Sequence, residues 1–375
     1  MTIAKPNSSW GGAQKYLKTL IGKLLENGFG VDAAIDRRAD VTDLERWFAD
    51  QGVGVHHLPL IGGGDLSIFL EMRKLLRHRG YGAVHFNGFP RTMAPAILAA
   101  RMARIGRRVM TLHLPVAEDP DAYHREQLLR WYWREHRRNR FCLATLTDII
   151  CINESLREEL VKPLRQDPGK IHRIYNGIDL PAYRRRAEPG QGQPLTIGAI
   201  GLLSEVKRLD ILLHAVSLID RRSPIRLLIA GAGALEPDLR RLIGDLGLEG
   251  RAELVGYQSS IQDFLSRLDV FAMSSDSEGI PYALLEAMAS GLPSVVTGVG
   301  GIPEMVEDQV EALVVCKGDP RAFAAALERL IADGALRAAL GERARRRAES
   351  QFSLQSMLDQ TLAVFRAPRP MASGS

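Results

Sequence analysis

The sequence predicts an α/β protein made of two doubly wound, Rossmann-like domains that face a central cleft. Its 375 residues exceed the ~100–200 that are usual for one domain. Both halves alternate short apolar runs with amphipathic helices, which is the pattern of parallel sheets covered on both faces. A polar stretch rich in glycine and proline, residues 184–194, separates the halves and is typical of a linker.

The first domain is expected over residues 1–185. Its predicted strands are the apolar runs Val31–Ile35, Ala83–Phe86, Arg108–Leu112 and Ile149–Ile152. A helix is predicted over Ala13–Glu26, because its leucines and isoleucine recur on a single face. The first strand is the weakest expectation, since only Met1–Pro6 precedes the glycine-rich loop and the apolar run in it is short.

The second domain is expected over residues 186–345, where the pattern restarts. Residues 346–375 should form a final helix that crosses back to the first domain, followed by a tail, of which Met371–Ser375 is excluded from function. The predicted strands are Leu195–Ile200, Ile225–Ala230, Ala252–Leu254, Val270–Met273 and Ser294–Thr297, with a helix over Leu209–Ile219.

The composition, with 46% hydrophobic and 25% charged residues, is that of an ordinary globular protein. The three cysteines lack C-x-x-C spacing, which favours a reducing compartment and argues against a structural zinc site. No run reaches the ~18 apolar residues of a membrane-spanning helix, and the N-terminus has no apolar signal region. We therefore expect a cytoplasmic protein without a structural zinc site.

The charge is distributed unevenly along the chain. Residues 1–185 carry 29 basic and 20 acidic side chains, a net charge of +9, whereas the remainder carries 20 and 24, a net charge of −4. A basic half beside a slightly acidic half suggests that one domain meets an anionic partner, such as a phospholipid surface or a phosphate-bearing acceptor.

The segment after Val270–Met273 carries the most chemistry. Two carboxylates, Glu278 and Glu286, stand eight positions apart. Gly279 permits a tight turn, and the helix that follows through Ile280 and Pro281 offers its positive end to a diphosphate. Glu286 lies about two turns further, where a carboxylate can accept hydrogen bonds from ribose hydroxyls. For two arbitrary glutamates, a purely structural interpretation is at least as well supported as the functional one. In it, Glu286 is a solvated helix residue and Glu278 is a first-turn acid that the helix dipole stabilises.

The wider pattern favours function, because the segment resembles the E-x7-E signature of family-4 glycosyltransferases, including the small-Gly-x-Pro after it. Further matches follow the family's order along nearly the whole chain. They are Gly11-Gly12-Ala13-Gln14, Thr111-Leu112-His113, Tyr175-Asn176-Gly177-Ile178-Asp179, Gly201 through Lys207, and Ala230-Gly231-Ala232-Gly233. Each fragment taken alone is weak: the glycines read as turns, His113 as a core or surface residue, and Lys207 as a solvated lysine.

The resemblance implies a GT-B fold and retaining, metal-independent sugar transfer. The acceptor would bind the first domain and the nucleotide-sugar the second. Lys207 would stabilise the leaving diphosphate, and Glu278 would hold the sugar. His113 would position the donor sugar or the acceptor. The other donor-binding residues implied are Gly11, Gly12, Gly233, Gly279, Ile280, Pro281 and Glu286.

One departure from the family pattern concerns the lysine loop. Leu202 stands where an arginine is common, and Arg208 where glycine is usual. Loss of one charge-assisted contact to a diphosphate costs about 1.5–3 kcal/mol, unless Arg208 or another residue replaces the arginine in donor binding. The departure bears on rate and donor type rather than on the fold.

Residues 124–141 are basic and aromatic, and two interpretations stay open. The segment could lie on an anionic membrane surface at the inner face of the membrane, or form a packed helix with a solvated basic face. The second is favoured, because charges lie all round the helix. Nucleic-acid binding is not expected, since no recognisable module supports it.

The sequence thus predicts transfer from a UDP- or GDP-sugar to a glycan, lipid-linked or small-molecule hydroxyl, in bacterial polysaccharide or glycoconjugate biosynthesis. Two alternatives remain. One is a nucleotide-sugar epimerase of the same architecture, which the glutamate pair disfavours. The other is a non-catalytic nucleotide-sugar-binding or scaffold protein, which Leu202 motivates.

Overall fold

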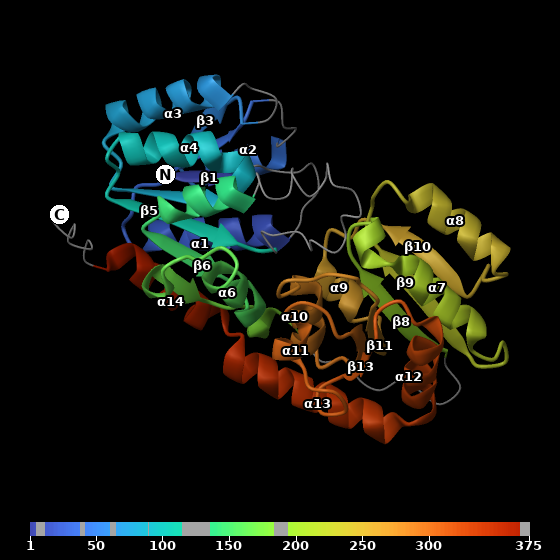
Figure 1. Ribbon diagram of the computed structural model, residues 1–375. Helices are drawn as coiled ribbons and strands as arrows, with labels where there is room; N and C mark the ends of the chain where they lie inside the picture. Colours follow the sequence, from blue (N-terminus) through green and yellow to red (C-terminus); the bar gives the residue numbers. More distant parts are fainter. Residues whose placement is uncertain are drawn as a thin grey trace. The chain divides into compact units, whose positions relative to one another are not determined.

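The computed structural model describes residues 1–4, 12–37, 42–60, 65–88, 90–114, 136–183 and 194–367. Contacts divide the chain into two compact units (Figure 1), the first comprising residues 1–175 with 358–375 and the second residues 176–357. The linker predicted at 184–194 lies outside the described residues except for Pro194, so the domain boundary at 185 stays a prediction.

Within its described residues, the first unit contains a seven-stranded parallel sheet in the order β3-β2-β1-β4-β5-β6-β7. The strands are β1 (Thr2–Ala4), β2 (Asp32–Asp36), β3 (Gly54–Leu58), β4 (Ala83–Asn87), β5 (Arg107–Leu112), β6 (Asp148–Cys151) and β7 (Ile171–Arg173). The helices with given bounds are α1 (Gly12–Glu26), α2 (Thr42–Asp50), α3 (Asp65–Arg79), α4 (Pro90–Met102), α6 (Glu154–Val161) and the 3-10 turn η2 (Pro168–Lys170). The weakly predicted first strand is present, and it lies centrally between β2 and β4.

Helices cover both faces of this sheet. Figure 1 shows α3 and α4 together on one side and α1 on the other. The last helix of the chain, α14 (Leu354–Arg366), begins in the second unit and contributes its residues from Leu358 onward to the first. Both sides of the sheet are therefore shielded from water, which explains why β2, β4 and β6 are almost wholly buried.

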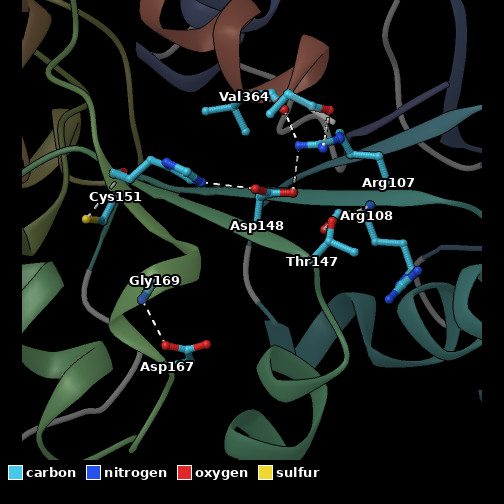
Figure 2. A network of polar contacts seen from close by, with 10 residues as sticks. Arg107, Arg108, Thr147, Asp148, Cys151, Asp167, Gly169 and Val364 are labelled. Carbon is cyan, nitrogen blue, oxygen red and sulfur yellow. Dashed lines mark hydrogen bonds and ion pairs between the residues drawn. The ribbon is translucent and has the colours of Figure 1, made fainter. Parts of the chain in front are cut away.

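An arginine at the start of β5 attaches the end of α14 to the first unit. The Arg107 guanidinium donates hydrogen bonds to the carbonyls of Val364 and Ala367 and pairs with Asp148 at 3.1 Å (Figure 2). The last carbonyls of a helix lack partners within the helix, and Arg107 supplies donors to two carbonyls at this end of the chain.

The second unit contains, in the part of the chain that is described, a six-stranded parallel sheet in the order β10-β9-β8-β11-β12-β13. Its strands are β8 (Leu195–Ile200), β9 (Ile225–Ala230), β10 (Ala252–Gly256), β11 (Val270–Met273), β12 (Ser294–Thr297) and β13 (Leu313–Val315). Its helices are η3 (Leu180–Ala182), η4 (Glu205–Lys207), α7 (Leu209–Leu218), α8 (Glu236–Asp245), α9 (Ile261–Leu265), α10 (Tyr282–Ala289), α11 (Ile302–Met305), α12 (Pro320–Ala332) and α13 (Gly334–Gln351).

The helices of the second unit pack against one another, and α12 contacts α13. Helix α7 contacts α8 and α12, and α10 contacts α9 and α13. The apolar faces of α7 and α12 meet the sheet in a core that includes Leu212, Val216, Phe323 and Leu327, all fully buried. Strands β11 and β12 are buried over their whole length. The predicted α/β class with two Rossmann-like units is confirmed.

Candidate functional site

The two loops with the strongest motifs leave the second sheet side by side. Strands β8 and β11 are neighbours, although the chain visits β9 and β10 between them. Such a reversal of strand order is a topological switch point, and ligands of open α/β sheets bind beyond the carboxyl ends of the strands there. The loop after β8 leads to Lys207, and the loop after β11 leads to Glu278.

Lys207 and Glu278 form an ion pair at this point. Lys207 Nζ lies 2.6 Å from Glu278 Oε1, with the lysine side chain 25% exposed and the glutamate 8%. Ser275 Oγ donates to the same oxygen at 2.6 Å. In the described part of the chain, Glu278 Oε2 has no hydrogen-bond partner. The carboxylate is thus held through one oxygen, while the other remains able to accept from a ligand hydroxyl.

The backbone at the end of β8 makes room for the lysine. A Cβ added at Gly201 would lie 3.3 Å from Lys207 Cε, so the aliphatic part of the side chain lies directly over this glycine. Any larger residue at Gly201 would press on the lysine. The glycine that opens the lysine loop therefore has a steric reason to be there.

Hydrogen bonds join the loop after β11 to the lysine loop. Ser274 Oγ donates to the carbonyls of Lys207 and Arg208 at 3.0 and 2.8 Å, and the Asp276 N–H donates to the Val206 carbonyl at 2.8 Å. Fixing both loops to each other positions the Lys207–Glu278 pair before any ligand arrives.

The loop after β12 supports Glu278 from another direction. Gly300 has a φ of +56°, and a Cβ there would lie 1.8 Å from the Glu278 carbonyl oxygen. The Gly301 N–H donates to the Gly279 carbonyl at 3.1 Å. Only glycine combines this backbone conformation with so close an approach. Gly279 itself is buried within this arrangement.

Helix α10 begins directly after Pro281. It has no side-chain cap and no acidic residue in its first turn, so its first backbone N–H groups can meet an anion. The residue before the proline is also held, because Asn176 Nδ2 donates to the Ile280 carbonyl at 2.8 Å. Ile280 and Pro281 therefore define where the positive end of the helix starts.

Glu286 lies on α10 with only 6% of its surface exposed. Tyr183 Oη donates to Glu286 Oε1 at 3.0 Å. Burial, together with the charge of Glu286, raises the pKa of the Tyr183 hydroxyl, so this hydroxyl remains a hydrogen-bond donor. Because this carboxylate is buried and accepts a hydrogen bond from a phenol, the solvated-helix interpretation does not hold for Glu286, and its ribose role stays a prediction.

Arg208 is engaged within its own unit. Its φ of +45° is a left-handed conformation that favours glycine, in keeping with the glycine usual at this position. Its guanidinium pairs with Asp210 at 3.0 Å and with Asp276 at 3.1 Å, and these hydrogen bonds raise the arginine pKa. Leu202, in the place of the expected arginine, is 48% exposed.

The structure explains one of the two remaining glycine motifs by packing. A Cβ at Gly233 would lie 2.3 Å from the Leu203 carbonyl oxygen, so this glycine lets the loop after β9 pack on the loop after β8. Gly12 is the exposed first residue of α1, whereas Gly11 lies outside the described residues.

His113 follows β5 in the first unit and contacts two side chains. Its Nε2 lies 2.7 Å from Asn87 Oδ1, at the end of β4. The Tyr16 ring packs against it edge-on, at 5.0 Å between centroids. Burial lowers the pKa of His113 to about 4, so the imidazole is neutral at pH 7.

The structure thus gathers Lys207, Arg208, Gly233, Gly279, Ile280, Pro281 and Glu278 in the loops of the second unit, with Glu286 along α10, and it places Gly12 and His113 in the first. Sequence reasoning missed Ser275, Tyr183, Gly300 and Asn87. Ser275 contacts the nearby Glu278, whereas the other three contact site residues that are distant in sequence.

In the described ranges, no helix is long and apolar enough to cross a bilayer, and no three His, Cys, Asp or Glu residues cluster as metal ligands. Of the segment 124–141, residues 124–135 lie outside the description.

Comparison with known proteins identifies the family. A model described as "Glycosyltransferase Family 4" matches residues 10–181, and one described as "Glycosyl transferases group 1" matches residues 194–333. The amylovoran biosynthesis glycosyltransferase AmsK of Erwinia amylovora is 36% identical over 170 residues, which cover 43% of this chain and 42% of AmsK. The chain therefore spans less than half the length of this relative.

A longer alignment joins the chain to an Escherichia coli protein. The UDP-Gal:alpha-D-GlcNAc-diphosphoundecaprenol alpha-1,3-galactosyltransferase is 27% identical over 285 residues, 72% of each chain. The crystal structure of Anabaena Alr3699/HepE in complex with UDP-glucose superposes with a TM-score of 0.80 at 19% identity, covering 98% of this chain and 100% of the other. The two parallel-sheet units thus form a fold of the GT-B class. The chain belongs to the group 1, family 4 glycosyltransferases, as its motifs predict.

Proposed function

We propose that this protein is a retaining glycosyltransferase that moves a sugar from a UDP- or GDP-sugar to a hydroxyl acceptor. The observation that carries the proposal is the Lys207–Glu278 pair, 2.6 Å apart at the switch point of the second sheet. A partly exposed cation beside a carboxylate with one unoccupied oxygen suits a ligand that has both a diphosphate and sugar hydroxyls.

In the proposed reaction, the bond from the sugar's anomeric carbon to the diphosphate breaks, and the acceptor oxygen forms its bond on the same face. The acceptor proton passes to the leaving phosphate oxygen. Lys207 and the first N–H groups of α10 stabilise the charge that develops on the diphosphate. Lys207 can do so without releasing Glu278, since an ammonium group has three donors. With this cation in place, we propose that transfer needs no metal.

Each remaining site residue has a proposed contact. Glu278 holds sugar hydroxyls through Oε2, and Glu286 accepts from the ribose. His113 hydrogen-bonds the donor sugar or the acceptor. The other residues that line the donor site in this proposal are Gly11, Gly12, Arg208, Gly233, Gly279, Ile280 and Pro281.

The acceptor class is drawn from the relatives' names. AmsK is described by amylovoran biosynthesis, and the E. coli enzyme by a diphosphoundecaprenol-linked acceptor. We propose a glycan, lipid-linked or small-molecule acceptor in bacterial polysaccharide or glycoconjugate synthesis, and a cytoplasmic location.

Contact of residues 124–141 with an anionic membrane is tested by flotation with anionic liposomes at low salt, and protein that stays at the bottom contradicts it.

A thermal-shift screen across UDP- and GDP-sugars, followed by assay of donor hydrolysis, tests the function. A ligand at 100 times its dissociation constant stabilises the folded state by about 2.7 kcal/mol, which is readily detected as a rise in Tm. We expect at least one donor to raise Tm and to be turned over. Binding of a donor without turnover, whatever the acceptor, would instead support the scaffold alternative.

A further inference from the structure

Asn87 is a buried amide with two directed contacts in the first unit. It ends β4 with 6% of its surface exposed. Its Nδ2 donates to the Ala13 carbonyl in the first turn of α1, at 3.2 Å, and its Oδ1 lies 2.7 Å from His113 Nε2. A carbonyl can only accept, so the contact with Ala13 fixes which end of the amide is nitrogen and which is oxygen.

This orientation determines where the imidazole proton lies. Because Asn87 turns an oxygen toward His113, the hydrogen bond between them requires a proton on Nε2 of the ring. A neutral imidazole carries a single N–H, so Nδ1 is left as a hydrogen-bond acceptor. The edge-on contact of Tyr16 with the ring restricts its rotation further.

We propose that Asn87 is a positioning residue, which holds His113 as the Nε2–H tautomer and so presents Nδ1 as an acceptor for a hydroxyl of the substrate. The identity of that hydroxyl, on the donor sugar or the acceptor, rests on the proposed function. The tautomer itself does not. A histidine at this point therefore receives a hydrogen bond from the substrate rather than donating one.

Nitrogen-15 NMR of the protein with labelled histidines, at pH 7, reads the tautomer directly, and a His113→Gln variant identifies the His113 signals by their loss. We expect an unprotonated Nδ1 in the unaltered protein. In Asn87→Leu the acceptor is gone, and both tautomers should be populated. In Asn87→Asp an acceptor oxygen remains, and the Nε2 proton should stay.

Thr111→Val is the matched control. Thr111 lies next to this network, and its hydroxyl contacts Tyr16 at 3.2 Å and His85 at 2.9 Å, but within the described residues it makes no hydrogen bond to His113. Its replacement should leave the His113 tautomer unchanged. Asn87→Leu should also lower kcat/KM for donor turnover by about tenfold, the value of one hydrogen bond, with Asn87→Asp less affected.

The outcomes separate the two claims. A proton on Nδ1 in the unaltered protein overturns the proposal, and this measurement needs the His113→Gln variant only for assignment and no Asn87 variant. An Asn87→Leu protein that keeps only the Nε2–H tautomer also overturns it. Failure of every nucleotide-sugar to be turned over would instead contradict the proposed function and leave the tautomer result standing.

Discussion

Lys207 Nζ and Glu278 Oε1 lie 2.6 Å apart at the switch point of the second sheet, with Ser275 Oγ on the same carboxylate oxygen. The pair joins two loops that are 71 residues apart in sequence. The charge of the nearly buried Glu278 carboxylate is therefore compensated by Lys207, a lysine that is itself partly exposed and can contact a ligand.

Replacing Lys207 by methionine should lower kcat/KM by one to two decades, because a charge-assisted contact to the diphosphate is worth about 1.5–3 kcal/mol. Steady-state kinetics with the best donor is the measurement. Lys162→Met is the control: Lys162 pairs with Glu158 at 3.0 Å on an exposed helix face, where such a pair contributes about 0.5 kcal/mol or less. Equal activity of the two variants would remove Lys207 from the mechanism.

Glu286 and Tyr183 should both affect donor affinity. Glu286→Ala should weaken the binding of UDP or GDP by at least about tenfold, since it removes the proposed acceptor for the ribose hydroxyls. Tyr183→Phe keeps the carboxylate but loses the hydroxyl that holds it at 3.0 Å, so a smaller loss, about two- to tenfold, is expected. Isothermal titration measures both. An unchanged dissociation constant in Glu286→Ala would show the ribose role to be wrong.

Leu202→Arg should restore the cation that the family pattern expects. We predict an increase in kcat/KM of about tenfold or more, because a second charge-assisted donor becomes available to the diphosphate. Val206→Arg is the control, since Val206 is as exposed as Leu202, 49% against 48%, and lies in the same loop. If both arginines have the same effect, general electrostatic attraction explains it and the specific contact is absent.

Gly300→Ala should damage the site more than its backbone conformation alone explains. Gly318 also has a positive φ, +75°, but a Cβ there meets nothing within 4 Å. Gly318→Ala therefore measures the strain of the left-handed conformation, about 1 kcal/mol. Gly300→Ala adds a collision with the Glu278 carbonyl, and should unfold at a lower urea concentration and lose donor affinity. Similar unfolding midpoints and affinities in the two variants would contradict the packing described for Glu278.

Asp148 should stabilise the first unit in a pH-dependent way. Burial acts to raise its pKa, but hydrogen bonds from His172 and Thr147 and the charge of Arg107 lower it overall. A carboxyl with a lowered folded-state pKa stabilises the native state above its unfolded pKa of about 3.9, and the stabilisation is lost as pH falls through the folded value. Asp148→Asn should thus be less stable than the unaltered protein at pH 7, with the difference narrowing below about pH 4. A difference in unfolding free energy that does not vary with pH would refute this.

The elements that the sequence predicts are those with continuous apolar runs. Strands β11 and β12 are recognisable because every residue in them is buried. The strands that were not predicted, β3, β7 and β13, are three of the four outer strands of the two described sheets, and they are short or polar, with two histidines in β3. The fourth outer strand, β10, was predicted. An edge strand is paired on one side only, so its sequence need not be uniformly apolar.

The same limit applies to the candidate site. Glu278, Glu286 and Lys207 lie in motifs whose spacing is visible along the chain. Tyr183 and Asn87 carry no local signal, because their partners Glu286 and His113 are 103 and 26 residues away. Only the folded arrangement shows that these two residues orient groups that the motifs identify.

The most direct test of the central claim, retaining transfer from a nucleotide-sugar, is proton NMR of the sugar first released from an α-linked UDP-sugar. Retention predicts that the α anomer appears first and only later equilibrates with the β anomer. Release of the β anomer first would contradict the proposed mechanism, and the absence of turnover of every donor that binds, whatever the acceptor, would contradict catalysis itself.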